Sequence, residues 1–234
     1  MPTKPTKDKS AFKQSLSLFY GAPGVGKTTF VNDLTKQKVL FISTDRGTKY
    51  LDTMRVECNG WGQLETILTA LKKNSTAYDF ICVDHIDDIC NMAEVATCEE
   101  MNIESLGDAD WGKAWKQYET KLRSLVQSLL GLKLGLIFIA HSVIRPIKNR
   151  SIEIDTTMPA LSKAAGRVIM PMLDIIGHIS VRSFKTKEGK RTEKHIIQTQ
   201  PKEELYCKDR TDRKKAKQDY EILDADAFLA TFGE

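Results

Sequence analysis

The sequence lacks the features of a membrane or secreted protein. We identify no N-terminal apolar signal segment, and the longest strongly apolar run, residues 134–140, is far too short to cross a bilayer. The five cysteines show neither metal-ligand spacing nor a paired framework, which predicts that they are reduced. Together these absences predict a cytoplasmic protein with no membrane partner.

Internal repeats and low-complexity segments are also absent. The apolar fraction of 41% and the charged fraction of 28% are ordinary for a globular protein, so composition excludes the disordered, fibrous and disulfide-scaffold classes. A chain of 234 residues suits one substantial domain. We predict a flexible basic arm over residues 1–14, followed by one domain over residues 15–234. The formal charge of +4 is uneven, since Lys and Arg crowd in the arm and again near residues 208–217, where they either hold polyanions or form a solvated face.

Short apolar runs alternate with helical patterns over the first two thirds of the chain. Consecutive apolar residues are typical of strands buried on both faces, as in a parallel sheet. The predicted strands are residues 16–20, 38–43, 80–83 and 134–140. The predicted helices are residues 27–36, 62–73, 87–101 and 111–130, the last with Trp111 and Trp115 in an apolar stripe that we expect in the core. This alternation predicts an α/β fold with a doubly wound, mostly parallel sheet flanked by helices.

The final third has a different pattern. Residues 174–183 and 192–199 alternate or run apolar around a turn that contains Gly189, which predicts a hairpin. A short strand over residues 205–208 and a closing helix over residues 225–232 complete the pattern. We therefore expect antiparallel C-terminal strands added to the parallel sheet.

A phosphate-binding loop lies between the first predicted strand and the first predicted helix. Its sequence matches the pattern G-x-x-x-x-G-K-[ST] in full, and glycines at three positions let the main chain wrap a phosphate. Lys27 is expected to neutralise the β and γ phosphates of ATP, and the Thr28 hydroxyl to ligate Mg²⁺. The alternative is a glycine-rich turn that matches by accident. The predicted ATP-binding residues are Gly21, Ala22, Pro23, Gly24, Val25, Gly26, Lys27, Thr28 and Thr29.

Three further candidates follow strands of the same sheet. Asp84 ends an apolar run and is expected to hold Mg²⁺, although an acid there is also an ordinary loop or cap residue. The next residue is His85, so a catalytic base must come from elsewhere; Asp45, after the second strand, is the best candidate, with a turn before Gly47 as the alternative. His141, after the fourth strand, either detects the γ phosphate or is a hydrogen-bonded interior histidine.

These motifs, GAPGVGKT, the strand ending in Asp45, FICVD and IFIAHS, resemble the RecA-type core P-loop ATPases. The resemblance is strongest to small phage-encoded, AAA-type ATP-binding proteins of single-strand annealing and recombination. It implies a sheet in the order 5-1-4-3-2, assembly into a ring or filament, and ATP-controlled binding of single-stranded DNA, with a single-strand DNA-binding protein as a possible partner, in the host cytoplasm. A catalytic glutamate of such proteins is matched here by Asp45, whose shorter reach implies slow hydrolysis. Adenine is implied by the resemblance, since no guanine-reading N-K-x-D motif is present.

Two basic segments acquire roles from the same resemblance. Residues 142–163 are predicted to be a long irregular loop at the place of a RecA-type DNA-binding loop, or else a plain surface loop. The DNA-binding candidates are Arg145, Lys148, Arg150 and Lys163. Lys208 and Arg210 resemble the cations that one RecA-type subunit offers to the ATP of its neighbour, or else belong to a basic strand end.

Two other functions remain open on the sequence. One is a P-loop kinase of a small molecule, for which residues 142–163 would act as a lid. The other is an assembly module that uses ATP as a switch with little turnover, which the short side chain of Asp45 makes credible.

Overall fold

The computed structural model describes residues 12–45, 47–149, 152–185, 189–211, 213–214 and 219–233. Most of the predicted arm therefore lies outside the described residues. Its last residues form a short 3-10 helix, η1 (Phe12–Gln14), and the buried Phe12 ring packs against Phe80 and Phe228. No described helix is long and apolar enough to span a membrane.

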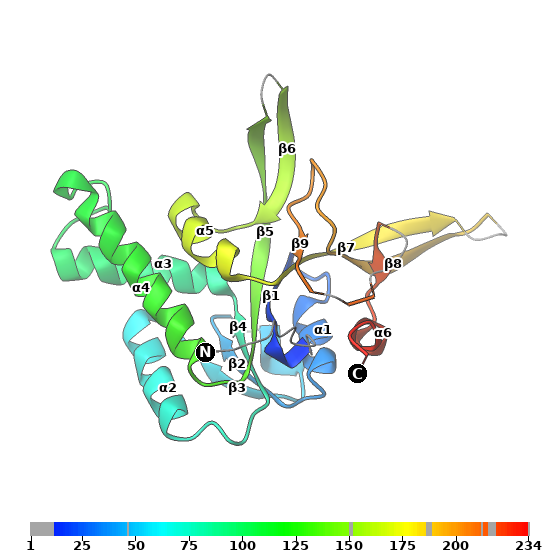
Figure 1. Ribbon diagram of the computed structural model, residues 1–234, viewed down its shortest axis with the longest axis horizontal. Helices are drawn as coiled ribbons and strands as arrows, with labels where there is room; N and C mark the ends of the chain where they lie inside the picture. The colour runs from blue at the N-terminus through cyan, green and yellow to red at the C-terminus, as the bar shows by residue number, and fades with distance from the viewer. Residues whose placement is uncertain are drawn as a thin grey trace, which may run out of the picture.

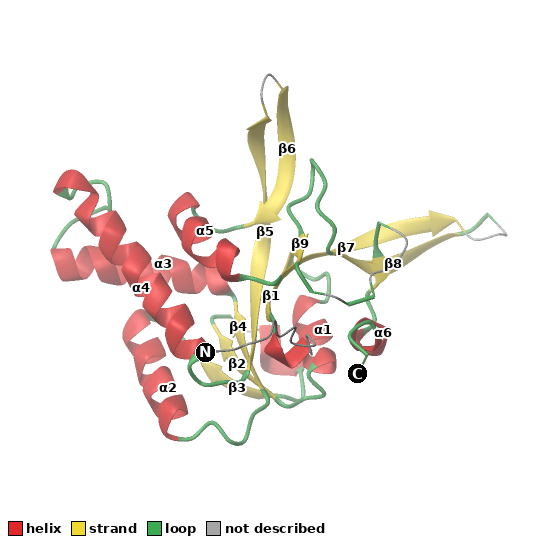
Figure 2. Ribbon diagram, viewed as in Figure 1, coloured by secondary structure: helices red, strands yellow, loops and turns green. Residues whose placement is uncertain are grey.

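One ten-stranded sheet organises the fold (Figures 1 and 2). Its main path runs β10-β8-β7-β1-β5-β4-β2-β3, with β6 paired to β5 and β9 paired to β7. The strands are β1 (Leu16–Gly21), β2 (Val39–Ser43), β3 (Met54–Glu57), β4 (Phe80–Asp84), β5 (Gly135–Asn149), β6 (Ile152–Pro159), β7 (Ile175–Lys185), β8 (Arg191–Gln198), β9 (Lys208–Asp209) and β10 (Glu221–Ile222).

The core of this sheet is parallel and has the predicted order. Pairing is parallel from β7 through β1, β5, β4 and β2 to β3. Numbered along the chain, the five strands predicted from the sequence lie as 5-1-4-3-2, which confirms the expected order. Antiparallel pairing of β8, β9 and β10 at the β7 end confirms the C-terminal extension.

Helices cover both faces of the parallel core (Figure 2). Alternation along β1 directs Leu18 and Tyr20 to one face and Phe19 to the other. The first face packs against α2, α3, α4 and α5, and the second against α1 and α6. The helices are α1 (Lys27–Leu34), α2 (Trp61–Lys73), α3 (Ile86–Met101), α4 (Lys113–Leu130), α5 (Lys163–Ile169) and α6 (Ala225–Ala230), with short 3-10 turns η2 (Gly47–Tyr50), η3 (Asp110–Gly112) and η4 (Met170–Met172).

The prediction of an irregular loop over residues 142–163 is wrong. Strand β5 continues well past the sheet and pairs with β6 from Ser142–Pro159 to Asn149–Ile152, which makes a projecting hairpin (Figure 1). Most described residues of the hairpin are exposed or only partly buried, so its strands carry mixed polar and apolar residues rather than the apolar runs that reveal buried strands.

Trp111 is a second correction, because its side chain is 97% exposed rather than part of the core. The residue has φ 56° in η3, and α4 begins only at Lys113, so the ring lies outside the helical stripe. Trp115 is also partly exposed, whereas Tyr118, Leu122, Leu125 and Leu129 further along the stripe are buried. The strand expected at residues 205–208 is β9, shifted toward the C-terminus.

Candidate functional site: the phosphate loop and its acidic neighbours

The phosphate loop connects the end of β1 to the start of α1. Gly24 and Gly26 have φ of 79° and 89°, a left-handed conformation that glycine adopts without strain. Gly21 is required for another reason, because a Cβ at this position would lie 2.2 Å from the carbonyl oxygen of Ile179 in β7. The motif glycines therefore shape the loop and let it lie against the neighbouring strand.

Lys27, the lysine of the motif, is 5% exposed at the first turn of α1. Its Nζ donates to the carbonyl oxygens of Gly21 and Ala22, each at 3.0 Å. Burial lowers the pKa of the Lys27 ammonium, although nearby carboxylates, chiefly that of Asp84, oppose the shift. A buried cation inside a loop of backbone amides provides a site for a polyanion.

Asp84 lies at the end of β4, directly opposite the loop. The Thr28 hydroxyl donates to Asp84 Oδ2 at 3.0 Å, and the Asp84 side chain is 0% exposed. Burial raises the pKa of the Asp84 carboxyl, while the charge of His85 and the hydrogen bond from Thr28 act in the opposite direction. The structure thus brings together the two residues predicted to hold Mg²⁺.

The other carboxylate oxygen of Asp84, Oδ1, indicates that this point is suited to a cation. Asp84 Oδ1 is buried, lies 3.1 Å from His85 Nε2, and accepts no hydrogen bond of good geometry from the described residues. A buried carboxylate oxygen without such a partner costs free energy that a divalent cation or its bound water would recover. Oxygen atoms are the ligands that Mg²⁺ prefers, so Thr28 and Asp84 fit this ion.

Asp45 follows β2 and lies on the far side of His85. Its Oδ2 is 3.8 Å from His85 Nδ1, and its Oδ1 accepts a hydrogen bond from the Gly47 amide at 2.8 Å. The side chain is 44% exposed. Asp45 therefore forms the turn that the sequence offered as an alternative, and it also borders the cluster around Asp84.

His141 is the last residue of the β5 segment that pairs with β1, where it lies opposite Gly21. Its Nδ1 lies 2.7 Å from Asp87 Oδ2, and its backbone amide donates to Asp87 Oδ1 at 3.2 Å. The His141 and His85 rings stack with centroids 4.0 Å apart. His141 is thus held by a carboxylate at one end and lies against the histidine that contacts Asp84.

Sequence reasoning missed three members of this cluster: His85, Asp87 and Asp88. Asp88 Oδ2 accepts from the Thr44 hydroxyl at 2.7 Å, and Thr44 in turn accepts from the His85 amide at 3.0 Å. The available signal was the pair of acids in the first turn of the helix that follows Asp84, where a negative charge also favours the helix N-terminus.

The remaining candidates lie elsewhere. Lys208 donates to the carbonyl oxygens of Met170 and Pro171, and Arg210 forms an ion pair with Asp174 at 2.9 Å, so both are held by their own chain. Among the DNA-binding candidates, Arg145 and Lys148 lie on β5, Lys163 begins α5, and Arg150 lies outside the described residues.

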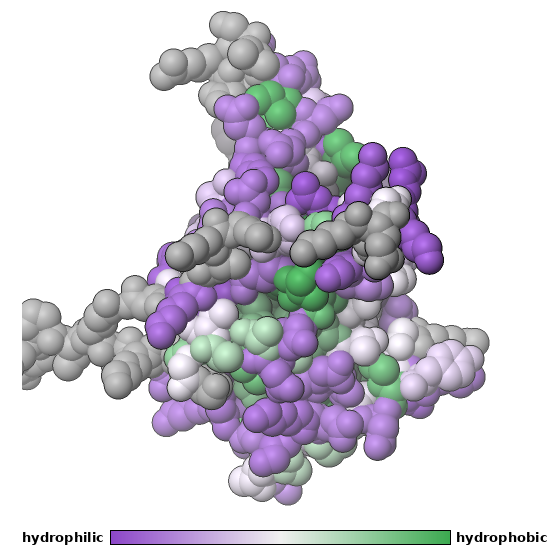
Figure 3. Space-filling view, turned by 90° about the vertical axis from the view of Figure 1, so that its right-hand side faces the viewer, coloured by the Kyte–Doolittle hydropathy of each residue, from purple (hydrophilic) through white to green (hydrophobic). Residues whose placement is uncertain are grey.

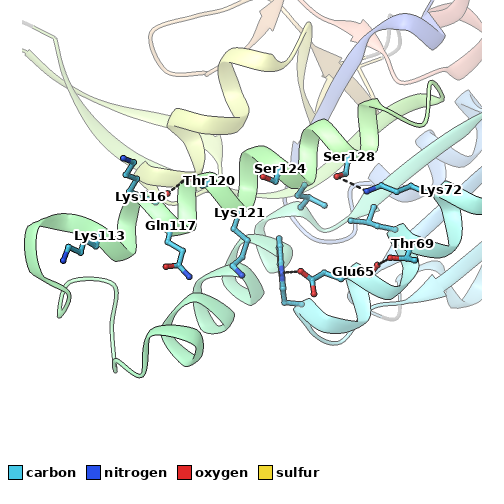
Figure 4. Close-up of a pocket in the computed structure, with 13 residues that line it drawn as sticks. Glu65, Thr69, Lys72, Lys113, Lys116, Gln117, Thr120, Lys121, Ser124 and Ser128 are labelled. Atoms are coloured by element: carbon cyan, nitrogen blue, oxygen red, sulfur yellow. Dashed lines mark hydrogen bonds between the residues drawn. The ribbon is translucent and has the colours of Figure 1, made fainter.

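Two cavities differ in their relation to the loop. One of about 530 Å³ adjoins it and is lined by Gly26 and Thr29, by His195 of β8, and by Asp224 and Asp226 at the start of α6. A larger one of about 740 Å³ lies between α2 and α4 and includes Trp61 and four lysines (Figure 4). No residue of the phosphate loop lines the larger cavity, so it takes no part in the site described here.

The chain is similar to several known proteins. A curated relative, the SPbeta prophage-derived uncharacterized protein YorG of Bacillus subtilis (strain 168), is 28% identical over 129 residues, which are 53% of this chain and 39% of that protein. Among solved structures, the KaiC-like protein PH0186 of Pyrococcus horikoshii OT3 matches 80% of this chain and 78% of its own at 12% identity, with a TM-score of 0.44. A family model described as an AAA domain, AAA_24, matches residues 15–211. The chain therefore belongs to this AAA domain family and is a P-loop ATPase-type domain.

Proposed function

We propose that the protein binds Mg·ATP at the phosphate loop and hydrolyses it. The observation that carries the proposal is the meeting of Thr28 with the buried Asp84 carboxylate at 3.0 Å, beside the buried ammonium of Lys27. The loop amides and Lys27 bind the phosphates and stabilise charge in the transition state. Thr28 and Asp84 hold the magnesium ion, which supplies further positive charge to the phosphate oxygens.

Asp45 is the proposed general base. Water attacks the γ phosphorus, the bond from that phosphorus to the bridging oxygen of ADP breaks, and Asp45 accepts the proton of the water. Its partly exposed carboxylate, with Oδ2 directed toward His85, is accessible for this role. Its short side chain supports slow turnover. His141, oriented by Asp87, is proposed to contact the γ phosphate.

The cavity beside the loop is the proposed site for the nucleoside. It begins at Thr29, next to the metal-binding Thr28, so a nucleotide with its phosphates in the loop can reach it. Asp224 and Asp226 supply acceptors for the amino group of adenine or the ribose hydroxyls. This arrangement supports the choice of ATP.

Single-stranded DNA is the proposed partner, bound by an assembly of several copies in a ring or filament that acts in recombination or annealing, with a single-strand DNA-binding protein as a further partner. Basic residues on the projecting β7–β8 hairpin support DNA binding. In such an assembly, Arg210 and Lys208 would exchange their own-chain partners for the phosphates of a neighbour. Hydrolysis would then depend on assembly.

The test is the rate of phosphate release by the full chain with Mg·ATP, alone and with a short oligothymidylate. We expect slow release that the oligonucleotide stimulates and that Lys27→Ala abolishes. Stimulation by a nucleoside or metabolite instead would indicate a kinase. Nucleotide binding without turnover under every condition would indicate an assembly switch and refute hydrolysis.

A further inference from the structure

The outer half of the β7–β8 hairpin leaves the sheet and projects on its own (Figure 1). Strand β1 pairs with β7 only as far as His178, and β10 pairs with β8 only at Ile196 and Ile197. Beyond these points residues 181–185 pair with residues 191–195 as a two-stranded ribbon. We call this part the β7–β8 ribbon; residues 186–188 at its end lie outside the described residues.

Positive charge is concentrated in the ribbon. Residues 181–195 contain six Lys or Arg and two Glu, a net charge equal to the +4 of the whole chain. Figure 3 views the molecule from the side on which the ribbon projects, and hydrophilic side chains dominate that face. A short segment that carries the whole net charge of the protein indicates a polyanionic partner.

The strand register places like charges directly opposite one another. Arg182 faces Lys194, and Lys185 faces Arg191. Opposed residues of an antiparallel pair share a face and lie about 5 Å apart at Cβ, so like charges there destabilise the ribbon. All four side chains are exposed, and the two pairs fall on opposite faces because Arg182 and Lys185 lie three positions apart along the strand. A bound polyanion would remove the repulsion on each face.

An aromatic surface accompanies one of these pairs. The rings of Phe184 and Tyr220 lie 5.6 Å apart, and the Arg182 guanidinium is 4.9 Å from the centroid of the Tyr220 ring. Both rings are only half-buried. Aromatic rings next to cations are the combination on which single-stranded nucleic acids stack their bases.

The other hairpin lacks this combination. On β5–β6, Lys148 faces Glu153, and Asp155 lies on the same strand as Glu153, so acids offset the two described cations Arg145 and Lys148. The ribbon, in contrast, has Glu193 as its one acid among the described residues. The difference favours the β7–β8 ribbon over the β5–β6 hairpin as the surface for a polyanion.

The β7–β8 hairpin contacts the phosphate loop at two points, one at His195 on the inner end of the ribbon and one at Ile179 below it. His195 Nδ1 forms a hydrogen bond with the Val25 carbonyl oxygen at 2.9 Å, and the Ile179 carbonyl oxygen lies against Gly21. A nucleotide that changes the position of Val25 therefore acts directly on the strand that carries Arg191 and Lys194.

We propose that the β7–β8 ribbon is a binding site for single-stranded nucleic acid, coupled to the phosphate loop through His195 and Val25. The two cation pairs bind phosphates, and bases stack on Phe184 and Tyr220. This inference rests on the proposed function, because it locates the nucleic-acid surface of the proposed DNA-binding ATPase. It places that surface on the ribbon rather than on residues 142–163.

The test compares matched double variants of the full chain. The ribbon variant is Arg182→Ser with Lys194→Ser, and its control is Arg145→Ser with Lys148→Ser on the other hairpin. Affinity for a fluorescent oligothymidylate is measured over a range of salt. The ribbon variant should bind the oligonucleotide about tenfold or more weakly than the parent. The slope of log affinity against log salt concentration should become shallower by about 1.4, the value for two lost phosphate contacts to a single strand. The control variant should stay close to the parent in both affinity and slope.

Further measurements separate the possible failures. Both variants should still bind ATP; if the ribbon variant does not fold, Lys185→Ser with Arg191→Ser replaces it. Parent-like affinity and salt slope in the ribbon variants would overturn the ribbon assignment while the proposed function stands. Failure of the parent to bind the oligonucleotide, with or without ATP, would overturn both DNA binding and the ribbon.

Two controls address chemistry and coupling. Polyglutamate that displaces the oligonucleotide as well as unlabelled oligothymidylate would overturn the nucleic-acid assignment in favour of an acidic protein partner. A non-hydrolysable ATP analogue should change oligonucleotide affinity in the parent, and the oligonucleotide should change nucleotide affinity by the same factor. Equal affinities with and without nucleotide would overturn the coupling.

Discussion

Replacement of Asp84 by asparagine should stabilise the protein and remove its magnesium-dependent turnover. The buried carboxyl of Asp84 has a raised pKa, which means that the folded environment disfavours its ionised form. Replacing the poorly satisfied buried carboxylate by a neutral amide should add about 1–3 kcal/mol to the free energy of unfolding. The hydrogen bond from Thr28 becomes weaker when its acceptor loses its charge, which reduces this gain. We expect a net gain of about 1 kcal/mol and a Tm higher by about 2–4 °C for a chain of this length.

The raised pKa of Asp84 also determines how the stability difference between the parent and Asp84→Asn changes with pH. The folded-state pKa of Asp84 lies above its ordinary value of 3.8, so the native state retains the proton to higher pH. The Asp84 carboxyl therefore contributes most to the stability of the parent protein below pH 3.8, where it is protonated in both the folded and the unfolded state. This contribution is lost as the pH rises through the raised pKa of the folded state. The stability advantage of Asp84→Asn should therefore be small near pH 3.8 and grow as the pH increases.

Thermal unfolding at several pH values, without magnesium or nucleotide, measures the effect. The matched control is Asp79→Asn at the other end of β4, where a hydrogen bond from Lys13 lowers the pKa of the carboxyl. This exposed pair contributes at most about 1 kcal/mol, so its loss should destabilise slightly. Phosphate release by Asp84→Asn should fall by at least about a hundredfold. A lower Tm for Asp84→Asn at neutral pH, or a difference that does not change with pH, would refute the reasoning.

Four other substitutions test the site and its surroundings. Lys27→Ala should abolish ATP binding or turnover and leave the fold intact by circular dichroism; unchanged turnover would remove Lys27 from the mechanism. Gly21→Ala should destabilise by about 2 kcal/mol or more, because its Cβ would meet a carbonyl oxygen of β7, whereas Gly62→Ala, with open space around it, should be near neutral in chemical denaturation. Arg213→Ala should destabilise by about 3–5 kcal/mol, because the buried guanidinium holds two carboxylates; a loss under 1 kcal/mol would contradict this. Arg210→Ala should lower hydrolysis only under conditions of assembly, and an equal loss in a verified monomer would exclude action on a neighbouring subunit.

Much of the fold was predictable because the central strands are covered on both faces. Their residues form continuous apolar runs, as in β2 and β4, and such runs are visible in a single sequence. The edge strand β3 (Met54–Glu57) was missed because its residues are mostly exposed. Strand β6 was missed because its polar and apolar residues are mixed and form no continuous apolar run. Pattern reasoning also placed Trp111 in the core, since it follows the period of α4 although the helix starts two residues later.

The phosphate loop was determined by the sequence itself. Its conformation depends on contiguous residues, with glycine at the two positions of positive φ, and Lys27 and Thr28 follow within the same turn of chain. The acid at the end of β4 was also predictable, because parallel strands deliver their last residues to one edge of the sheet.

Only the tertiary structure decided how the other polar groups pair. Asp87 meets His141 across 54 residues of sequence, and the like charges of the β7–β8 ribbon meet through a register that no local pattern specifies. Arg213, one of several basic residues near the C-terminus, proved to be buried between carboxylates rather than solvated. The physical reason is common to all three: a side chain's charge is local, whereas its partner and its burial depend on segments brought together by folding.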